Sequence, residues 1–198
     1  MNKLITFERH ICKKFENHAV GRTSLPFTLF HLGPALAIGL PLRKYIHAPT
    51  FILANILVDV EPLLVLVLGL NYPLHGYLHT FVFALFLGIA LGLVMFSLER
   101  FLQPVHKLLL LETDSKSRIG AFVVAGAFGT MLHVLFDAPL YSDIQPFYPL
   151  TTANLMLNIV SSPEVYAATM WLGVLGVVLY ARLLLFLAYG KFRKTRTS

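Results

Sequence analysis

Two pairs of side chains in this sequence have the spacing of metal ligands. His75 and His79 lie four residues apart in the segment PLHGYLHT, and His133 and Asp137 repeat that spacing in HVLFDAP. On a helix, residues i and i+4 share one face, so each pair predicts two side chains that converge on one point. Imidazole and carboxylate groups are common ligands of divalent metals. We therefore predict metal ligands at His75, His79, His133 and Asp137.

Further ionisable residues lie in or beside apolar segments. Asp59 and Glu61 interrupt an apolar run at VDVEP, His31 lies in TLFHLGPALAIGL, and Asp143 follows in YSDIQPFYP. Ionisable groups inside a membrane are costly, so each is a candidate for function. We expect Asp59 or Glu61 to be a further ligand or a general base. We expect His31 to be a ligand or a proton shuttle, and Asp143 to bind substrate.

Each of these patterns also has a structural interpretation. Histidines at i and i+4 occur by chance on many helices, HxxxD also serves capping or ion pairing, and an aspartate before a break can cap the next helix. Together, however, four histidines and four acids would all need hydrogen bonds in an apolar medium. The joint pattern favours one or two divalent metals, with zinc first and iron or manganese as alternatives.

The segments that carry these residues are those of a membrane protein. Of the 198 residues, 57% are hydrophobic and only 13% are charged, whereas soluble domains hold about 45–50% apolar and about 25% charged residues. The formal net charge of +6 lies in short segments that flank the apolar runs. This distribution indicates contact with anionic membrane lipids and argues against nucleic acid. The single cysteine, Cys12, excludes an intramolecular disulfide.

We predict an all-α membrane bundle of four full spans plus a short N-terminal re-entrant or half helix. The full spans are expected at residues 50–70, 78–98, 119–137 and 167–189. Residues 28–40 are too few for the ~20 that a span needs. Pro62 should kink or break the first full span. The domain organisation is then a basic lead at 1–26, a single transmembrane domain at 27–190 and a basic tail at 191–198.

The positions of lysine and arginine predict the orientation in a cell membrane. None of the sixteen lies in residues 71–77 or 138–167. Cytoplasmic segments carry an excess of Lys and Arg, so these two segments should face outside and both basic termini should be cytoplasmic. The lead and the basic 41–49 loop then share one side, which requires residues 28–40 to enter and leave the membrane by the same face.

The ordered set HLGPALAIG, VDVEP, HGYLHT and HVLFDAP with DIQPFYPL resembles a known family. Over residues 27–150 it is similar to the small membrane-bound metal-dependent hydrolases of bacteria and archaea, which include the LexA-regulated inner-membrane hydrolases. The resemblance places His31, Asp59, His75, His79, His133 and Asp137 at family motif positions, with Glu61 as the second acid. The chain departs from the family before the first acid, where Val58 replaces the family's proline. Its two histidines are also one residue closer together than in the family motif, and the motif's arginine is absent.

The leading interpretation is a membrane-embedded metal-dependent hydrolase. A site in the outer half of the bilayer suggests a lipid or lipid-linked phosphoester as substrate. The alternative is a transporter or channel for protons or metal ions, with the same residues along its path, although the internal repeat common in transporters is absent from this sequence. A third interpretation is a structural subunit. His10, His18, His47 and His106 are expected to be ordinary polar residues of cytoplasmic segments.

Overall fold

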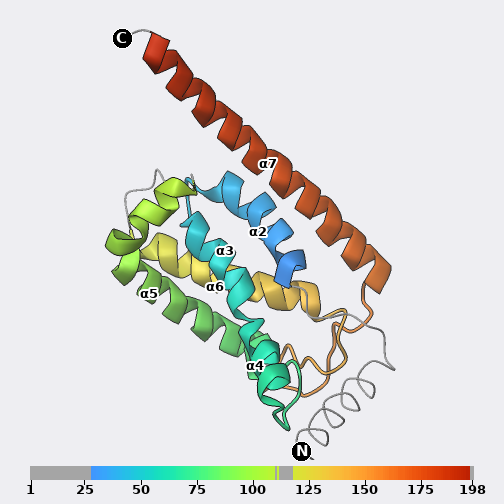
Figure 1. The fold of residues 1–198 in the computed structure, drawn as a ribbon. Coiled ribbons are helices and arrows are strands. Elements are labelled where there is room, and N and C mark those ends of the chain that lie inside the picture. Colours follow the sequence, from blue (N-terminus) through green and yellow to red (C-terminus); the bar gives the residue numbers. More distant parts are fainter. Residues whose placement is uncertain (1–27, 110, 112–117, 197–198) are drawn as a thin grey trace, which may run out of the picture.

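The computed structural model describes residues 28–109, 111 and 118–196, which form a bundle of helices (Figure 1). The described residues form no strand, and the basic lead at 1–26 lies outside them. In chain order the elements are α2 (Thr28–Leu42), α3 (Ala48–Leu57), α4 (Val60–Leu68), the 3-10 turn η1 (Tyr77–His79), α5 (Phe81–Leu108), α6 (Ile119–Asp137) and α7 (Ser162–Arg196).

Within the described residues, four helical segments are long and apolar enough to cross a membrane. They are Ala48–Leu68, which comprises α3 and α4, followed by Phe81–Leu108, Ile119–Asp137 and Ser162–Phe186. Helix α2, which precedes these four segments, has only 15 residues. The predicted all-α membrane bundle with four full spans and one short helix is thus confirmed.

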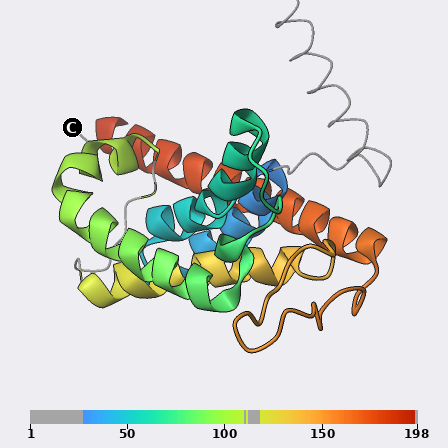
Figure 2. The same cartoon turned by 90° about the horizontal axis from the view of Figure 1, so that it is seen from below.

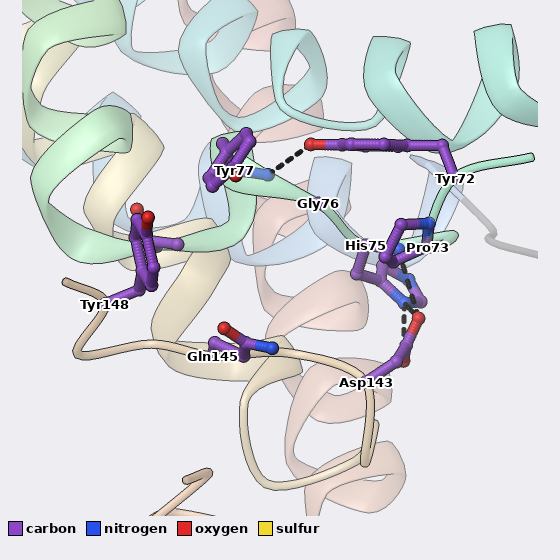
Figure 3. A pocket seen from close by; sticks show the side chains of 9 residues that line it. Tyr72, Pro73, His75, Gly76, Tyr77, Asp143, Gln145 and Tyr148 are labelled. Atoms are coloured by element: carbon purple, nitrogen blue, oxygen red, sulfur yellow. Dashed lines mark hydrogen bonds and ion pairs between the residues drawn. The ribbon is translucent and has the colours of Figure 1, made fainter. Parts of the chain in front are cut away.

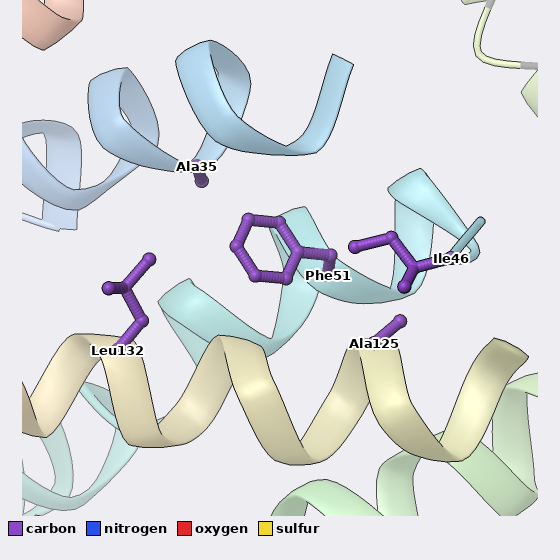
Figure 4. Packing of buried hydrophobic residues seen from close by; sticks show 5 residues of the cluster. All are labelled: Ala35, Ile46, Phe51, Ala125 and Leu132. Carbon is purple, nitrogen blue, oxygen red and sulfur yellow. The ribbon is translucent and has the colours of Figure 1, made fainter. Parts of the chain in front are cut away.

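The helices pack in a series. Helix α5 lies against α6, α6 against α3, α3 against α2, and α2 against α7. Helix α7 runs along α2 in both views (Figures 1 and 2), and Figure 1 shows its C-terminal part continuing past the rest of the bundle. Between α2, α3 and α6 lies a hydrophobic cluster, built on the fully buried Phe51 (Figure 4). Its other members are Ala35, Ile46, Ala125 and Leu132.

The first full span is broken, as Pro62 predicts, but the break lies upstream of the proline itself. Helix α3 ends at Leu57 and α4 begins at Val60. A proline has no N–H, and its ring clashes with the carbonyl four residues earlier, which for Pro62 is that of Val58. Glu61 N–H donates to Val58 O instead, at 3.2 Å. The break therefore falls at Val58 and Asp59.

Two helices extend further than expected. Helix α5 continues to Leu108, although the expected span ends at residue 98. Helix α7 begins at Ser162, before the expected start at residue 167, and continues to Arg196 through the expected basic tail. Apolar composition marks the part of a helix that lies in the bilayer, whereas the helix itself continues as long as its backbone hydrogen bonds do. Pro163 does not prevent the early start of α7, because a proline is tolerated in the first turn.

Candidate metal centre

The predicted ionisable residues come together at one end of the bundle, which we call the site end. The start of α2, the break after α3, the turn η1 and the last turns of α6 meet there. These elements supply, in that order, His31, Asp59, His79, and the pair His133 and Asp137. All five side chains are buried, and His79 and His133 are 0% exposed.

Four of these side chains surround one point and form the group that we call the inner cluster. Each offers one ligand atom within 4.8 Å of the others, and the members are Asp59, His79, His133 and Asp137. His133 Nε2 lies 3.3 Å from Asp137 Oδ2 and 3.4 Å from Asp59 Oδ1. His79 Nε2 lies 4.0 Å from Asp137 Oδ2. Ligands about 2.1 Å from a tetrahedral zinc ion stand about 3.4 Å apart, so the spacing fits an inner metal shell.

Three atoms of the inner cluster lack a hydrogen-bond partner among the described residues. They are Asp59 Oδ2, His79 Nε2 and His133 Nε2, and all three are buried. A buried polar atom left unsatisfied costs about 1–3 kcal/mol. A divalent cation at the shared point would satisfy imidazole nitrogens and carboxylate oxygens together, so the donor set fits a metal ion.

The helix break prepares His133 for this role. In an unbroken helix Asp59 N–H would donate to Asn55 O, but it donates to Ile56 O instead, at 3.2 Å. The Asn55 carbonyl is thereby released and lies 2.7 Å from His133 Nδ1. A proton held on Nδ1 leaves the Nε2 lone pair for a metal.

The same break leaves the Asp59 carboxylate to the inner cluster. Asp59 is the N-cap residue of α4, yet its side chain makes no capping hydrogen bond. Helix capping was the structural explanation for an aspartate at this position, and the geometry does not support it.

A carboxylate contacts Nδ1 of His79 and another contacts Nδ1 of His75, so in both rings the contact is opposite to Nε2. His79 Nδ1 lies 3.2 Å from Glu61 Oε2, and His75 Nδ1 lies 3.1 Å from both oxygens of Asp143. Glu61 also accepts hydrogen bonds from Leu78 N–H at 3.1 Å and from the Tyr72 hydroxyl at 3.3 Å. A carboxylate on Nδ1 is the usual outer support of a histidine that binds metal through Nε2.

The pKa values of His79 and Asp143 favour the charge states that metal binding needs, a neutral imidazole and an ionised carboxylate. Burial is the main influence on the His79 pKa and lowers it, despite the hydrogen bond to Glu61, so the ring is neutral. Burial alone would raise the pKa of Asp143, but hydrogen bonds from the His75 ring and backbone N–H hold it below its ordinary value. A neutral imidazole is the form that binds a metal ion.

His31 reaches the inner cluster through Asp137. Its Nε2 lies 3.1 Å from Asp137 Oδ1, and its ring centroid lies 3.9 Å from that of His133. Asp137 therefore faces His31 with one oxygen and His79 and His133 with the other. His31 is in position to exchange a proton with this carboxylate.

His75 lies beside the inner cluster but is not a member of it. The prediction that His75 and His79 share one face of a helix is wrong, because His75 precedes η1 and α5 begins only at Phe81. Pro73 and Gly76 disfavour a regular helix in this segment. The two rings nevertheless lie 4.7 Å apart, and His75 Nε2 has no hydrogen-bond partner among the described residues.

A small pocket opens next to His75 (Figure 3). Its volume is about 180 Å³, and its lining includes Asp143, Gln145 and three tyrosines, Tyr72, Tyr77 and Tyr148. Asp143 was expected to bind substrate, and its carboxylate both lines this pocket and contacts the His75 ring. The pocket therefore adjoins the histidines of the site end.

A second group of ligand-type side chains was missed by the sequence analysis. His47, Glu99 and His106 meet at the opposite end of the bundle, although both histidines were expected to be ordinary loop residues. Glu99 and His106 are seven residues apart on α5, two turns along one face, and that spacing was the available signal. His47 comes from the distant α2–α3 connection, so only the folded chain places it there.

Comparison of the chain with protein-family models, with curated proteins and with solved structures gave no match.

Proposed function

We propose that this protein is a membrane-embedded metal-dependent hydrolase that acts on a lipid or lipid-linked phosphoester at the site end. The observation that carries the proposal is the inner cluster, in which two imidazoles and two carboxylates converge and three buried atoms lack a partner among the described residues. Metal binding is the part that the geometry supports directly. The hydrolytic reaction is inferred from the chemistry of this donor set.

The inner cluster would hold the metal through His79, His133, Asp137 and Asp59. When bound, a divalent metal such as zinc polarises a phosphoryl or carbonyl oxygen and lowers the pKa of water to near neutral. Asp59 has one oxygen, Oδ1, 3.4 Å from His133 Nε2, while Oδ2 has no partner among the described residues. With Oδ1 as the metal ligand, Oδ2 can accept a proton from the attacking water, which would give this buried oxygen the partner that it otherwise lacks among the described residues.

His31 and the outer carboxylates complete the assignment of roles. His31, at Asp137 Oδ1, can return a proton to the leaving group. Glu61 accepts hydrogen bonds with both oxygens and therefore serves as a positioning residue for His79. Asp143 positions His75 in the same way.

The pocket beside His75 is the proposed entrance for the substrate headgroup. Its volume of about 180 Å³ suits a small polar group. Gln145 and the hydroxyls of Tyr77 and Tyr148 can donate hydrogen bonds to phosphate oxygens. The Tyr72 hydroxyl, in contrast, already donates to Glu61. Tyr77, in the pocket wall, is 49% exposed on the outer surface of the bundle. A lipid can therefore present its headgroup to the pocket while its acyl chains stay in the bilayer.

A path for ions through the bundle has less support. The hydrophobic cluster on α2, α3 and α6 lies between the site end and the group at His47, with Leu132 next to His133 and Ile46 next to His47. A transporter requires polar groups along its path. We therefore favour chemistry at one end of the bundle over transport through it.

The test combines metal analysis with turnover. Protein purified in detergent should lose one equivalent of zinc in His79→Ala/His133→Ala relative to the unaltered chain. In phospholipid vesicles the unaltered protein should release a phosphorylated headgroup or phosphate, and Asp59→Asn should lower that rate at least about 100-fold, as expected for loss of a general base. Glu164→Gln, at an exposed carboxylate outside the site, is the matched control. Equal zinc content in the double variant would contradict the metal site, and zinc flux without phosphoester cleavage would favour transport.

A further inference from the structure

The end of the bundle opposite to the site end carries a second convergent group. His47 lies just before α3, and Glu99 and His106 lie in the last third of α5. Glu99 Oε2 is 3.4 Å from His47 Nε2 and 3.2 Å from His106 Nδ1. His47 is 3% exposed and His106 is 6% exposed, so two imidazoles face one carboxylate oxygen in a buried setting.

The contacts in this group are not ordinary hydrogen bonds. Glu99 Oε2 and His106 Nδ1 are buried and have no hydrogen-bond partner among the described residues, although they lie 3.2 Å apart. A distance of 3.2 Å permits a hydrogen bond, so the relative orientation of the imidazole and the carboxylate is what does not fit. Donor atoms that lie close together without pointing at one another are the arrangement of ligands around a cation.

His47 is fixed in the orientation that a ligand needs. Its Nδ1 lies 2.7 Å from Thr50 Oγ1, and its ring is stacked on Phe122 of α6 with centroids 3.9 Å apart. Nε2 is thereby directed to Glu99. Burial, followed by the nearby His106, lowers the pKa of His47 to about 3, so its ring is neutral at physiological pH.

We propose that His47, Glu99 and His106 form a second metal site for a zinc-type divalent cation. Two imidazoles and one carboxylate are an established zinc ligand set that leaves a fourth position for water. Imidazole ligands select zinc over magnesium or calcium, which prefer oxygen atoms. This site is independent of the inner cluster and of the hydrolase proposal, because the two share no residue.

The position of the second site indicates a structural role. His106 lies in the part of α5 beyond the expected span, which ends at residue 98, and His47 lies in the connection from α2 to α3. His47 N–H also donates to Ala121 O of α6 at 3.2 Å. A metal held by the three ligands would therefore tie the extension of α5 to the α2–α3 connection and, through His47, to the start of α6.

Zinc titration of the purified full chain in detergent tests the proposal. The unaltered protein should bind one more equivalent of zinc than Glu99→Gln, which keeps the size of the side chain while removing the charge. Thr50→Val retains all three ligands but removes the contact to His47 Nδ1, and it should weaken zinc at this site about 10–100-fold. Gln103→Ala, at an exposed position on the same helix, is the control and should bind zinc as the unaltered protein does.

Cobalt provides a second measurement, which observes the second site in a protein that lacks the inner cluster. In His79→Ala/His133→Ala, which lacks the inner cluster, Co²⁺ should still give the visible absorption of a four-coordinate site, and Glu99→Gln on that background should abolish it. The same zinc stoichiometry in the unaltered protein and in Glu99→Gln would overturn the proposal and leave His47, Glu99 and His106 as a polar contact only. The two proposals fail separately. If Glu99→Gln leaves the zinc content unchanged, the second site is wrong, and if His79→Ala/His133→Ala leaves it unchanged, the inner cluster is wrong.

Discussion

At the scale of single residues, three imidazoles at the site end each have two nitrogens in different surroundings. In His75, His79 and His133, Nδ1 faces a hydrogen-bond acceptor, and Nε2 is left for a metal ion. Three different acceptors face Nδ1: the Asn55 carbonyl for His133, Glu61 for His79 and Asp143 for His75. In each case Nε2 is the nitrogen without a partner among the described residues. The outer acceptors therefore decide which nitrogen is available to a metal, and they matter as much as the ligands.

Glu61→Gln tests this outer layer. The amide keeps the approximate shape of the side chain but lacks the charge that holds the His79 ring, so zinc at the inner cluster should bind about 10–100-fold more weakly. Competition with a chromogenic chelator measures the affinity. Glu164→Gln should have no effect on it. An unchanged affinity in Glu61→Gln would show that Glu61 does not position His79.

At the scale of elements, close approach of two helices places η1 and α6 next to one another. Gly88 and Gly92 on α5 face α6, and a Cβ on Gly92 would lie 2.6 Å from Phe122 O. A Cβ on Gly126 of α6 would meet Gly88 O in turn. Small residues let helix backbones come this close in a membrane. Because α5 begins immediately after His79 and α6 carries His133, their separation determines the width of the inner cluster.

Gly126→Ala should therefore destabilise the bundle. The added methyl group meets backbone, which cannot rotate away, and such overpacking costs about 1–3 kcal/mol. Thermal unfolding in detergent should show a lower midpoint than for the unaltered protein. Gly120→Ala is the matched control on the same helix, because a Cβ there meets nothing within 4 Å. Equal midpoints for the two variants would contradict the packing argument.

At the scale of the whole molecule, the inner cluster and the group of His47, Glu99 and His106 lie at opposite ends of the bundle, with the hydrophobic cluster between them. The connections at 69–80 and 138–161 lie at the site end, and lysine and arginine are absent from 71–77 and 138–167. The connection from α2 to α3, at the other end, carries Arg43 and Lys44. The positive-inside rule therefore predicts that the site end faces outside and the second group faces the cytoplasm.

Cysteine labelling tests this orientation. On a Cys12→Ser background, Leu150→Cys at the site end should react with a membrane-impermeant maleimide in intact cells. Tyr45→Cys at the other end should react only after permeabilisation. Both positions are well exposed, at 88% for Leu150 and 75% for Tyr45. The reverse pattern of labelling would show that the site end is cytoplasmic.

The sequence by itself determined the class of the protein and most of the candidate residues. A continuous apolar run of about 20 residues forms a helix in a bilayer, because a helix makes all its backbone hydrogen bonds within the one segment. Ionisable residues within those runs are conspicuous for the same reason, and His31, Asp59, His79, His133 and Asp137 do meet at the site end. The break caused by Pro62 was likewise predictable from its missing N–H.

Only the tertiary structure decided how these residues divide into layers. Glu61 and Asp143 contact the Nδ1 atoms of His79 and His75. The Asn55 carbonyl, which the helix break releases, contacts Nδ1 of His133. His75 itself lies outside a helix. The group of His47, Glu99 and His106 joins residues more than fifty positions apart. Spacing along one helix predicts contacts within that helix, but contacts between helices depend on packing and register, which periodicity alone does not encode.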